Sequence, residues 1–367
     1  MRRISLCFLL IFLWGCANST SGTPADTPAP ASASVVISSA GPTLSIPTGT
    51  DEKAASQTSS LIPDNKEPVA TSTKEPESSR SVTLAFVGDI MLGRSLAKRI
   101  GRGEGETIFA SVESVLQSAD LAIGNLECAL GEGGVKAAKA YTFLAPPESA
   151  PLLRIAGFDL LSLANNHSLD FGQDVFRQTG ALLEENGIQF AGGGANETGA
   201  HAPVRFEIGG LRIAFLAYVD VASEYLSKFD TRSWSAGPAT PGIAWADDEE
   251  IKKDLQALNG NTDVIIVLFH FGTEGLATPD KRQIQLSHLA VDYGADLIVG
   301  SHPHLVQDVE QYKDGWIVYS LGNFVFDGFE GQANRSGILW VTVSGEKEIT
   351  YSLMALNIVE GIPRIGE

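Results

Sequence analysis

The sequence predicts an α/β domain over residues 81–367, in which mixed sheets pack face to face with helices outside, a four-layer αββα sandwich. The first observation is that short apolar runs typical of strands alternate with stretches of helical periodicity. Such uniformly apolar runs indicate strands that are buried on both faces of a sheet. The second observation is that polar clusters follow these runs, at the carboxyl ends where α/β sheets bind ligands.

Five apolar runs supply the main predicted strands, and a polar cluster follows each run. The runs are 82–87, 121–123, 160–163, 264–269 and 296–299, and the clusters are 88–89, 124–127, 164–167, 270 and 300–304. Helices are expected at 147–156, 174–186, 247–258 and 279–293. Because ligands bind beyond the carboxyl ends of such strands, we expect the five clusters to form one site.

The remainder of the domain predicts antiparallel strands. Two hairpin patterns pair residues 204–208 with 211–218 and residues 306–312 with 316–321. Further strands are expected at 338–343 and 350–358. The glycine-rich and aromatic segment 219–245 has no clear periodicity, and it is the best candidate for a lid or a substrate-facing loop.

Residues 1–16 form a predicted lipoprotein signal peptide, in which two arginines precede an apolar stretch too short to span a bilayer. Its last four residues, Leu13-Trp14-Gly15-Cys16, resemble the lipobox of bacterial lipoproteins. The alternative is an ordinary cleaved signal in which Cys16 occurs by chance. Residues 17–80 are rich in Ser, Thr, Ala and Pro, and predict a disordered tether. The expected location is therefore extracytoplasmic, lipid-anchored to a cell membrane.

Charge and cysteine content argue against nucleic-acid binding and against a role for cysteine as a disulfide or a nucleophile. The formal charge of −18, from 26 basic and 44 acidic residues, argues against a nucleic-acid partner. Of the three cysteines, only Cys128 lies in the domain, so no disulfide can form within one mature chain. Nothing nearby in the sequence would lower the pKa of Cys128, which we expect to be a small buried residue rather than a nucleophile.

The polar clusters contain the residue types that bind divalent cations. They are Asp89, Glu127, Asn166, His167, His270, His302 and His304. This mixture of oxygen and imidazole ligands suits Mn²⁺, Zn²⁺ or Fe²⁺. The strongest signal is His302-Pro303-His304, because two residues past a strand can present both rings to one site, although a lone His-x-His would more simply be structural. His201 and His288 lie elsewhere, and are expected to be a loop residue and a surface or packing residue.

Six motifs together resemble the CapA family of poly-γ-glutamate capsule proteins. They are residues 86–94 (FVGDIMLGR), 125–127 (NLE), 163–172 (LANNHSLDFG), 270–274 (HFGTE), 300–304 (GSHPH) and 320–324 (SLGNF). The resemblance covers nearly all of residues 81–327 in order. That family is similar to the calcineurin-like metallophosphoesterases, so the resemblance implies their four-layer αββα fold and a two-metal site.

The resemblance also implies the metal ligands, with Glu127 at the place of a bridging carboxylate. The implied ligands are Asp89, Glu127, Asn166, His270, His302 and His304. Two departures from the metallophosphoesterase pattern are that Met91 stands where a histidine is expected, and that Glu127 replaces the usual aspartate. One cation position then has Asn166, His270, His302 and Glu127, and the other has only Asp89, His304 and Glu127. We therefore expect one tightly bound and one weaker cation.

The same resemblance, or position in the sequence, implies roles for four other residues. His167 matches a catalytic histidine, which would protonate the leaving group or orient the substrate. Arg94 would clamp an anionic group or form a surface salt bridge. Glu274 would accept a hydrogen bond from a ligand imidazole. Asn323 is either a site residue or a turn former.

Three functional hypotheses are consistent with these residues. The first is a metal-dependent hydrolase at the cell surface that acts on a phosphoester or a γ-glutamyl bond, and this enzyme hypothesis is favoured. The second, implied by the CapA resemblance, is a role with the capsule synthesis machinery in synthesis, export or anchoring of an anionic polymer. The third is a non-catalytic binding lipoprotein. The first two are compatible, and fold resemblance does not select a substrate.

Replacing Cys16 with Ser should release the protein from membranes, because the lipid would have no attachment site. Fractionation of cells that produce the wild type and Cys16→Ser checks this expectation. A processed Cys16→Ser protein that stays in the membrane fraction would contradict the lipoprotein hypothesis.

Overall fold

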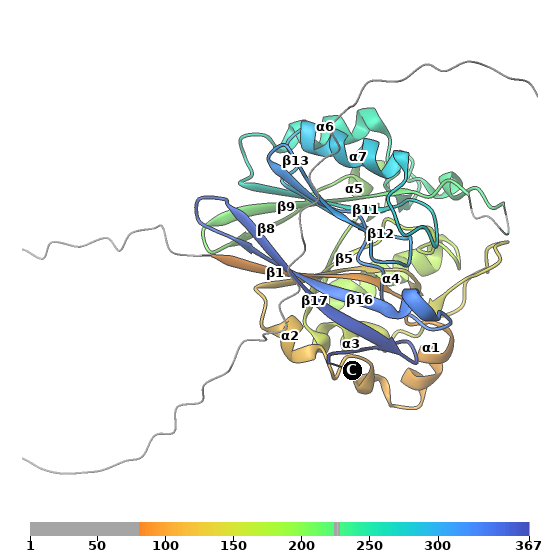
Figure 1. The fold of residues 1–367 in the computed structure, drawn as a ribbon. Coiled ribbons are helices and arrows are strands. Elements are labelled where there is room, and N and C mark those ends of the chain that lie inside the picture. The colour runs from red at the N-terminus through yellow and green to blue at the C-terminus, as the bar shows by residue number, and fades with distance from the viewer. Residues whose placement is uncertain (1–80, 224–225, 227, 367) are drawn as a thin grey trace, which may run out of the picture. The chain divides into compact units, whose positions relative to one another are not determined.

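The computed structural model describes residues 81–223, 226 and 228–366. The expected signal peptide (1–16) and tether (17–80) lie outside the described residues, so the domain boundary at residue 81 stays a prediction. In the described part, two sheets pack face to face and helices cover their outer sides (Figure 1). The predicted four-layer α/β arrangement is therefore confirmed.

The first sheet has eight strands in the order β18-β17-β16-β1-β2-β5-β6, with β15 beside β1. Strands β1, β2, β5 and β6 pair in parallel, whereas β16, β17 and β18 run antiparallel to their neighbours. The bounds are β1 (Val82–Ile90), β2 (Leu121–Leu126), β5 (Phe158–Ser162), β6 (Gln189–Ala191), β15 (Asn323–Val325), β16 (Arg335–Val343), β17 (Ile349–Val359) and β18 (Ile362–Arg364).

The second sheet has six strands in the order β13-β14-β12-β11-β9-β8. Its four central strands pair in parallel, and the two predicted hairpins form its antiparallel edges. The bounds are β8 (Val204–Ile208), β9 (Leu211–Asp220), β11 (Val264–Phe271), β12 (Leu297–Ser301), β13 (Val309–Tyr312) and β14 (Gly315–Val318). Two short pairs join β3 (Ala129–Leu130) to β4 (Leu144–Ala145) and β7 (Gly193–Gly194) to β10 (Gly242–Ile243).

The four predicted helices are present within two residues of their expected ends as α3, α4, α6 and α7. The α-helices are α1 (Arg94–Gly101), α2 (Glu113–Gln117), α3 (Ser149–Ala156), α4 (Gln173–Glu185), α5 (Glu197–Ala200), α6 (Asp248–Leu258) and α7 (Lys281–Asp292), and the 3-10 helices are η2 (Gly105–Ile108), η3 (Thr231–Trp234) and η4 (Gly331–Asn334). Helix α7 begins where the sequence signals it, because Asp280 and Gln283 form a capping box. None of the described helices combines the length and apolar composition needed to cross a membrane.

Strand β9 shows how the sequence builds two cores. Its side chains alternate between the faces of the sheet, as the pleat of a strand requires. One set packs between the sheets and consists of Ile213, Phe215 and Ala217. The other set packs under α6 and α7 and consists of Ala214, Leu216 and Tyr218. Strand β11 alternates in the same way. Burial on both faces therefore explains the uniformly apolar runs of the sequence.

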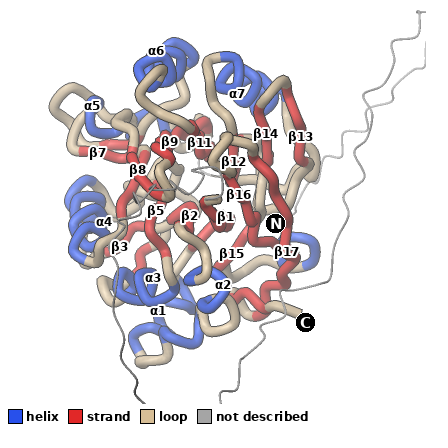
Figure 2. The backbone as a smooth tube through the Cα atoms, turned by 90° about the vertical axis from the view of Figure 1, so that its left-hand side faces the viewer, coloured by secondary structure: helices blue, strands red, loops and turns tan. Residues whose placement is uncertain are grey.

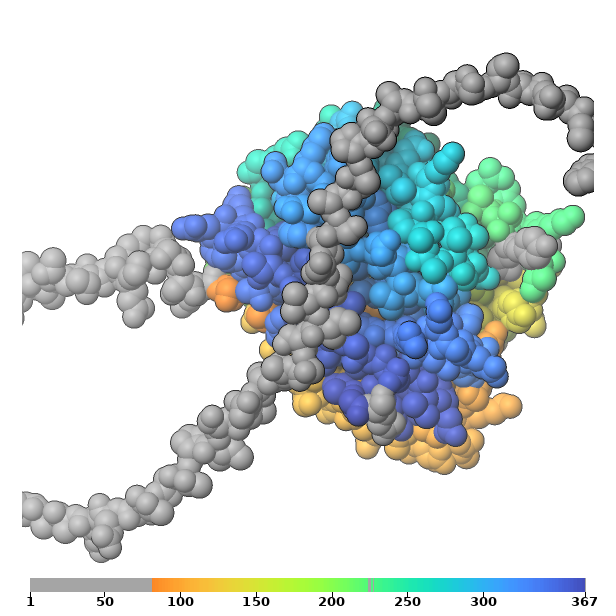
Figure 3. All heavy atoms as spheres, in the orientation of Figure 1, coloured from red at the N-terminus to blue at the C-terminus, as the bar shows by residue number. Residues whose placement is uncertain are grey.

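Helices α6 and α7 lie over the second sheet, and α1, α2 and α3 lie under the first (Figures 1 and 2). The space-filling view shows the dark blue C-terminal strands directly against the orange N-terminal helices (Figure 3). There, Ile365 N donates a hydrogen bond to Ser111 Oγ at 3.1 Å. The C-terminal end of the described chain is thus tied to the segment between η2 and α2.

Several strand ends and helix α1 are among the features that differ from the sequence prediction. Strands β1 and β11 continue past the expected ends at residues 87 and 269, so Asp89 and His270 lie within strands. The reason is that neighbouring strands continue the pairing, as Asp89 pairs with Asn323 and His270 pairs with Ser301. Helix α1 was not predicted, and its first residue follows Gly93, which supplies no side-chain cap.

Adding a methyl group at Gly88 should destabilise the domain. A Cβ at this position would lie 1.8 Å from the backbone oxygen of Gly322, which accepts a hydrogen bond from Asp89 N at 3.0 Å. Because this backbone cannot move away cheaply, we expect Gly88→Ala to lower the free energy of unfolding by about 1–3 kcal/mol or more in urea titrations. The matched control is Gly101→Ala, where no atom lies within 4 Å of the added Cβ. Equal stability of the two variants would contradict the prediction.

Candidate metal centre

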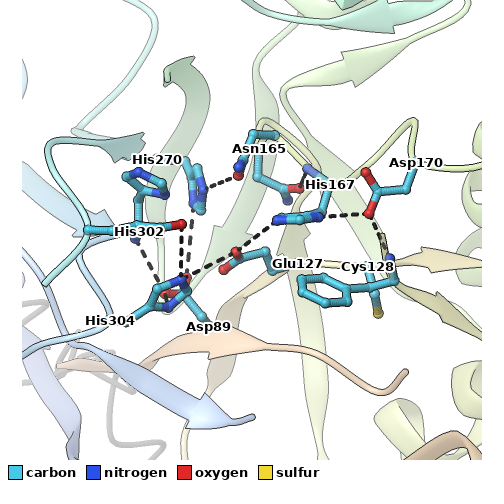
Figure 4. A network of polar contacts seen from close by, with 12 residues as sticks. Asp89, Glu127, Cys128, Asn165, His167, Asp170, His270, His302 and His304 are labelled. Carbon is cyan, nitrogen blue, oxygen red and sulfur yellow. Dashed lines mark hydrogen bonds and ion pairs between the residues drawn. The ribbon is translucent and has the colours of Figure 1, made fainter. Parts of the chain in front are cut away.

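The structure brings the seven clustered residues together where strand ends of both sheets converge. Figure 4 labels all of them except Asn166, whose Oδ1 lies 2.8 Å from His270 Nε2. They are Asp89 on β1, Glu127 after β2, Asn166 and His167 after β5, His270 on β11, and His302 and His304 after β12. None of the seven residues is more than 5% exposed. Residues separated by more than two hundred positions in the chain therefore form one buried polar site.

Asp89, Glu127 and His304 form one group of possible ligands. One donor atom of each residue lies within 4.8 Å of the other two. Asp89 Oδ2 is 3.3 Å from His304 Nδ1, and Glu127 Oε1 is 3.8 Å from His304 Nε2. These are the three residues that the sequence comparison assigns to the weaker cation position.

The carboxylate of Glu127 is the least satisfied group of the site. Both of its oxygens are buried and have no hydrogen-bond partner among the described residues. Burial and then the negative charge of Asp89 raise the pKa of Glu127 well above its ordinary range. An ionised carboxylate in such surroundings needs a cation, because burying an unpaired ion costs several kcal/mol. The residues at this position therefore fit a divalent metal ion.

The negative charge of Asp89, unlike that of Glu127, is stabilised by hydrogen bonds from neighbouring residues. Burial raises its pKa, but the hydrogen bond and charge of His304 and the hydrogen bond of Asn125 lower it further, so the net pKa is below the ordinary value. Asn125 Nδ2 donates to Asp89 Oδ1 at 2.8 Å, and His302 N lies 3.3 Å from Asp89 Oδ2. The ionised form of Asp89, which is the form that binds a cation, is the stable form.

His270 and Asn166 form a second group at the site. His270 Nε2 lies 2.8 Å from Asn166 Oδ1, and His270 Nδ1 lies 2.9 Å from Ser301 Oγ. Burial is the main cause that lowers the pKa of His270 well below its ordinary value. Neutral imidazole, which is the ligand form, is therefore favoured.

The turn that carries His302 and His304 has an unusual backbone. Both residues lie in the left-handed region, with φ of 97° and 58°. Such a conformation costs a side-chain-bearing residue about 1–3 kcal/mol, and it recurs at functional sites. His302 Nδ1 is buried without a hydrogen-bond partner among the described residues, and burial followed by the charge of His304 lowers the pKa of His302 to about 3. His302 is thus a neutral imidazole with an unused nitrogen.

His167 lies on the other side of Glu127 from His304 and Asp89 (Figure 4). Its Nε2 is 3.8 Å from Glu127 Oε1, and its Nδ1 is 2.7 Å from Asp170 Oδ2. Asp170 Oδ1 in turn accepts a hydrogen bond from Lys139 Nζ at 2.7 Å, and both side chains of this ion pair are fully buried. The Phe143 ring stacks on the His167 ring, with centroids 4.2 Å apart. These contacts hold the imidazole in one orientation.

Sequence reasoning missed Asp170 and Lys139. Asp170 lies within the motif 163–172, so its position three residues after His167 was the available signal. Lys139 lies in the loop between β3 and β4, and no pattern marks it. Its Nζ also donates to the backbone oxygen of Asn166 and lies 4.8 Å from the Trp234 ring. Trp234 belongs to the segment 219–245 that was predicted to face the substrate, so part of this segment contacts the loop beside His167.

Three asparagines support the ligand residues. Asn165 Nδ2 donates to Asn125 Oδ1 at 3.1 Å, and Asn165 Oδ1 accepts from His167 N at 2.9 Å. Asn323 Oδ1 lies 2.8 Å from His304 Nδ1, and Asn323 Nδ2 donates to the oxygen of Ala333. The sequence left Asn323 open between a site residue and a turn former, and the structure places it against a predicted ligand.

Arg94, Met91 and Cys128 lie beside the site but make other contacts. Arg94 Nη1 is 3.5 Å from Asp327 Oδ1, so Arg94 forms the salt bridge that was one of its two expected roles. Its guanidinium carbon also lies 4.5 Å from the Phe143 ring centroid. Met91 is buried in the core, and its Sδ accepts the N–H of Gly93 at 3.1 Å. Burial raises the pKa of the Cys128 thiol to about 12, which agrees with a structural cysteine.

Residues 83–328 match the model of the family described as bacterial capsule synthesis protein PGA_cap. The chain is also similar to two curated proteins of bacilli. It is 32% identical to the capsule biosynthesis protein CapA of Bacillus anthracis, over 77% of this chain and 69% of that protein. It is 32% identical to the PGA biosynthesis protein CapA of Bacillus subtilis strain 168, over 77% of this chain and 73% of that protein.

Two solved structures are similar to this chain at low sequence identity. A hypothetical protein from Thermus thermophilus is 16% identical, with a TM-score of 0.48 over 75% of this chain and 99% of that chain. A putative 5'-nucleotidase from Staphylococcus aureus is 13% identical, with a TM-score of 0.45 over 78% of this chain and 55% of that chain.

Two single substitutions should separate the cation positions. His270→Ala should remove most of the bound metal, because His270 belongs to the four-ligand set, whereas Asp89→Ala should remove mainly the weaker ion. Metal content of the full chain after equilibration with Mn²⁺ or Zn²⁺ checks this. His201→Ala is the control, because His201 contacts Asp254 outside the site. Equal metal loss from both site variants would argue against two distinct positions.

Proposed function

This chain belongs to the PGA_cap family of bacterial capsule synthesis proteins, and from that premise we propose that it acts in synthesis, export or anchoring of a poly-γ-glutamate capsule through a metal-dependent hydrolase site. The family membership supports the capsule role. The observation that carries the hydrolase site is the buried Glu127 carboxylate, which has no hydrogen-bond partner among the described residues and faces His167 and His304 at 3.8 Å. The proposed location is extracytoplasmic, with a lipid anchor at Cys16.

Six residues would hold the cations in this proposal. They are Asp89, Glu127, Asn166, His270, His302 and His304. Divalent cations would supply Lewis acidity toward a phosphoryl or acyl oxygen of the substrate. Asp89 is favoured as an anion, and His270 and His302 are favoured as neutral imidazoles. The protein thus keeps these groups in the protonation states that bind metal.

His167 is the proposed proton donor or acceptor. An Nδ1–H donated to Asp170 leaves the Nε2 of the neutral ring as the reactive nitrogen, on the side of Glu127. Nε2 can then exchange a proton with the leaving oxygen or nitrogen of the substrate. Asp170 and Lys139 act through His167, because they hold its ring and are themselves fully buried. The same chemistry serves a phosphoester or a γ-glutamyl amide.

The charge of the protein bears on an anionic polymer as substrate. The formal charge is −18, so the protein as a whole repels a polyanion. Cations at the site would reverse the sign of the local field. A γ-glutamyl polymer would therefore be recognised through the metal rather than through basic side chains. A general extracytoplasmic metallophosphoesterase is the alternative that the test below separates.

His167→Asn should lower hydrolysis about 10²- to 10⁴-fold without loss of metal, because the imidazole is a proton-transfer group rather than a ligand in this proposal. We would incubate the full chain, loaded with Mn²⁺ or Zn²⁺, with poly-γ-glutamate and with generic phosphomono- and phosphodiesters. Chain length of the polymer and released phosphate or alcohol are the readouts. The control is His201→Asn, which changes the same residue type outside the site.

The outcomes separate the parts of the proposal. Cleavage of phosphoesters alone would favour the general phosphoesterase. A metal-loaded wild type that cleaves none of these substrates would refute the hydrolase part and leave a binding role. Unchanged cell-bound poly-γ-glutamate after deletion of the gene from its host would refute the capsule role.

A further inference from the structure

A second group of possible cation ligands lies at the solvent side of the site. Glu274, His302 and His304 each offer one donor atom, and these atoms lie within 4.8 Å of one another. The Glu274 side chain is 63% exposed, whereas none of the six predicted cation ligands is more than 5% exposed. This outer group shares only His304 with the buried group of Asp89, Glu127 and His304.

Backbone contacts place Glu274 next to the paired histidines. Leu276 N donates to the backbone oxygen of Thr273 at 3.2 Å, which closes a turn with Glu274 and Gly275 at its tip. Gly275 has a φ of 73°, a conformation that such a turn takes most readily at glycine. Gly275 N also donates to the backbone oxygen of Pro303, between the two histidines, at 2.9 Å. The fold therefore holds Glu274 beside the histidine pair.

A hydrogen bond at Nδ1 determines which nitrogen of His304 can bind a cation. Asn323 Nδ2 donates to the backbone oxygen of Ala333, so Asn323 Oδ1 is the atom that faces His304 Nδ1, at 2.8 Å. Because this amide oxygen accepts a hydrogen bond, Nδ1 of His304 carries the hydrogen. In the neutral ring, the lone pair that can bind a metal ion is then on Nε2.

Two carboxylates, one buried and one exposed, approach His304 Nε2. Glu127 Oε1 is 3.8 Å from this nitrogen, and Glu274 Oε1 is 4.0 Å from it. Glu274 was predicted to accept a hydrogen bond from a ligand imidazole, and this distance does not support that role toward His304. Two donor atoms that are each about 2.1 Å from one ion can be up to about 4.2 Å apart, so either carboxylate can share an ion with Nε2. One lone pair binds one ion at a time, on the Glu127 side or on the Glu274 side.

We propose that Glu274, His302 and His304 form an outer cation position where an ion from solvent binds first, and that His304 Nε2 stays bound to the ion as Glu127 replaces Glu274. This inference rests on the proposed metal site. Two imidazoles and one carboxylate, with an exposed side left for water, are a ligand set typical of Zn²⁺. His302 suits this position because its Nδ1 has no hydrogen-bond partner among the described residues. The outer position empties when the ion moves inward, because both positions use the same nitrogen of His304.

The first test is the rate of Zn²⁺ uptake by the metal-free full chain, followed by stopped flow with a chromogenic zinc chelator. Glu274→Gln keeps the size of the side chain and removes its charge. We expect uptake and release to slow about tenfold or more, with the final zinc content unchanged, because the substitution alters the route and not the buried ligands. The control is Glu330→Gln, which removes the same charge from an exposed residue next to Phe329, whose ring centroid lies 4.6 Å from that of His304.

The second test isolates the outer position. Glu127→Gln combined with His270→Ala removes ligands from both buried positions and leaves the outer group intact. In isothermal titration this double variant should still bind Zn²⁺, and adding Glu274→Gln should weaken that binding about tenfold or more. Both proteins carry the same buried changes, so a loss of folding would affect them equally, and the uptake rates of the single variant then decide.

The outcomes distinguish this inference from the proposed function. A wild type that binds neither Mn²⁺ nor Zn²⁺ would refute the metal site itself. If the wild type binds zinc but Glu274→Gln takes it up as fast as the wild type, only the outer position is refuted. The inference is also wrong if Glu330→Gln slows uptake as much as Glu274→Gln, because general attraction of cations would then be sufficient. A final zinc content that falls in Glu274→Gln would make Glu274 a ligand of the bound state and overturn the transfer.

Discussion

Burial of the central strands of both sheets on both faces is the constraint on which the rest of this structure depends. Strands such as β9 and β11 send alternate side chains into two different cores, so neither face tolerates a polar residue along most of the strand. Polar chemistry is left to the strand ends, where the backbone pairing stops. Because ends from both sheets converge, the polar residues there form one site. The location of the site is thus a consequence of the packing of the sheets.

The site is buried, so its charges must be balanced locally. Asp89 receives hydrogen bonds from Asn125 and His302, whereas the Glu127 oxygens have no such partner among the described residues. Lys139 compensates Asp170, and that pair orients His167. The remaining imbalance is the buried Glu127 carboxylate, which is a group that a divalent cation can balance. Glu274 adds a further charge from the solvent side.

Family membership and site geometry answer different questions. The similarity to capsule synthesis proteins identifies the family, and says little about which bond is broken. The geometry shows residues that could hold a metal ion on one side of Glu127 and a held histidine on the other.

The sequence by itself determined the fold class, the two hairpins, four of the helices and the clusters that contain the ligand residues, because hydrophobic periodicity and turn residues act over short distances. Only the tertiary structure decided how far β1 and β11 extend, since the neighbouring strands supply the pairing. It also decided that Lys139 reaches Asp170, that Asn323 contacts His304 and that Glu274 lies beside the paired histidines. Each of these contacts joins segments that are distant or unpatterned in the chain, so no local rule could reveal them.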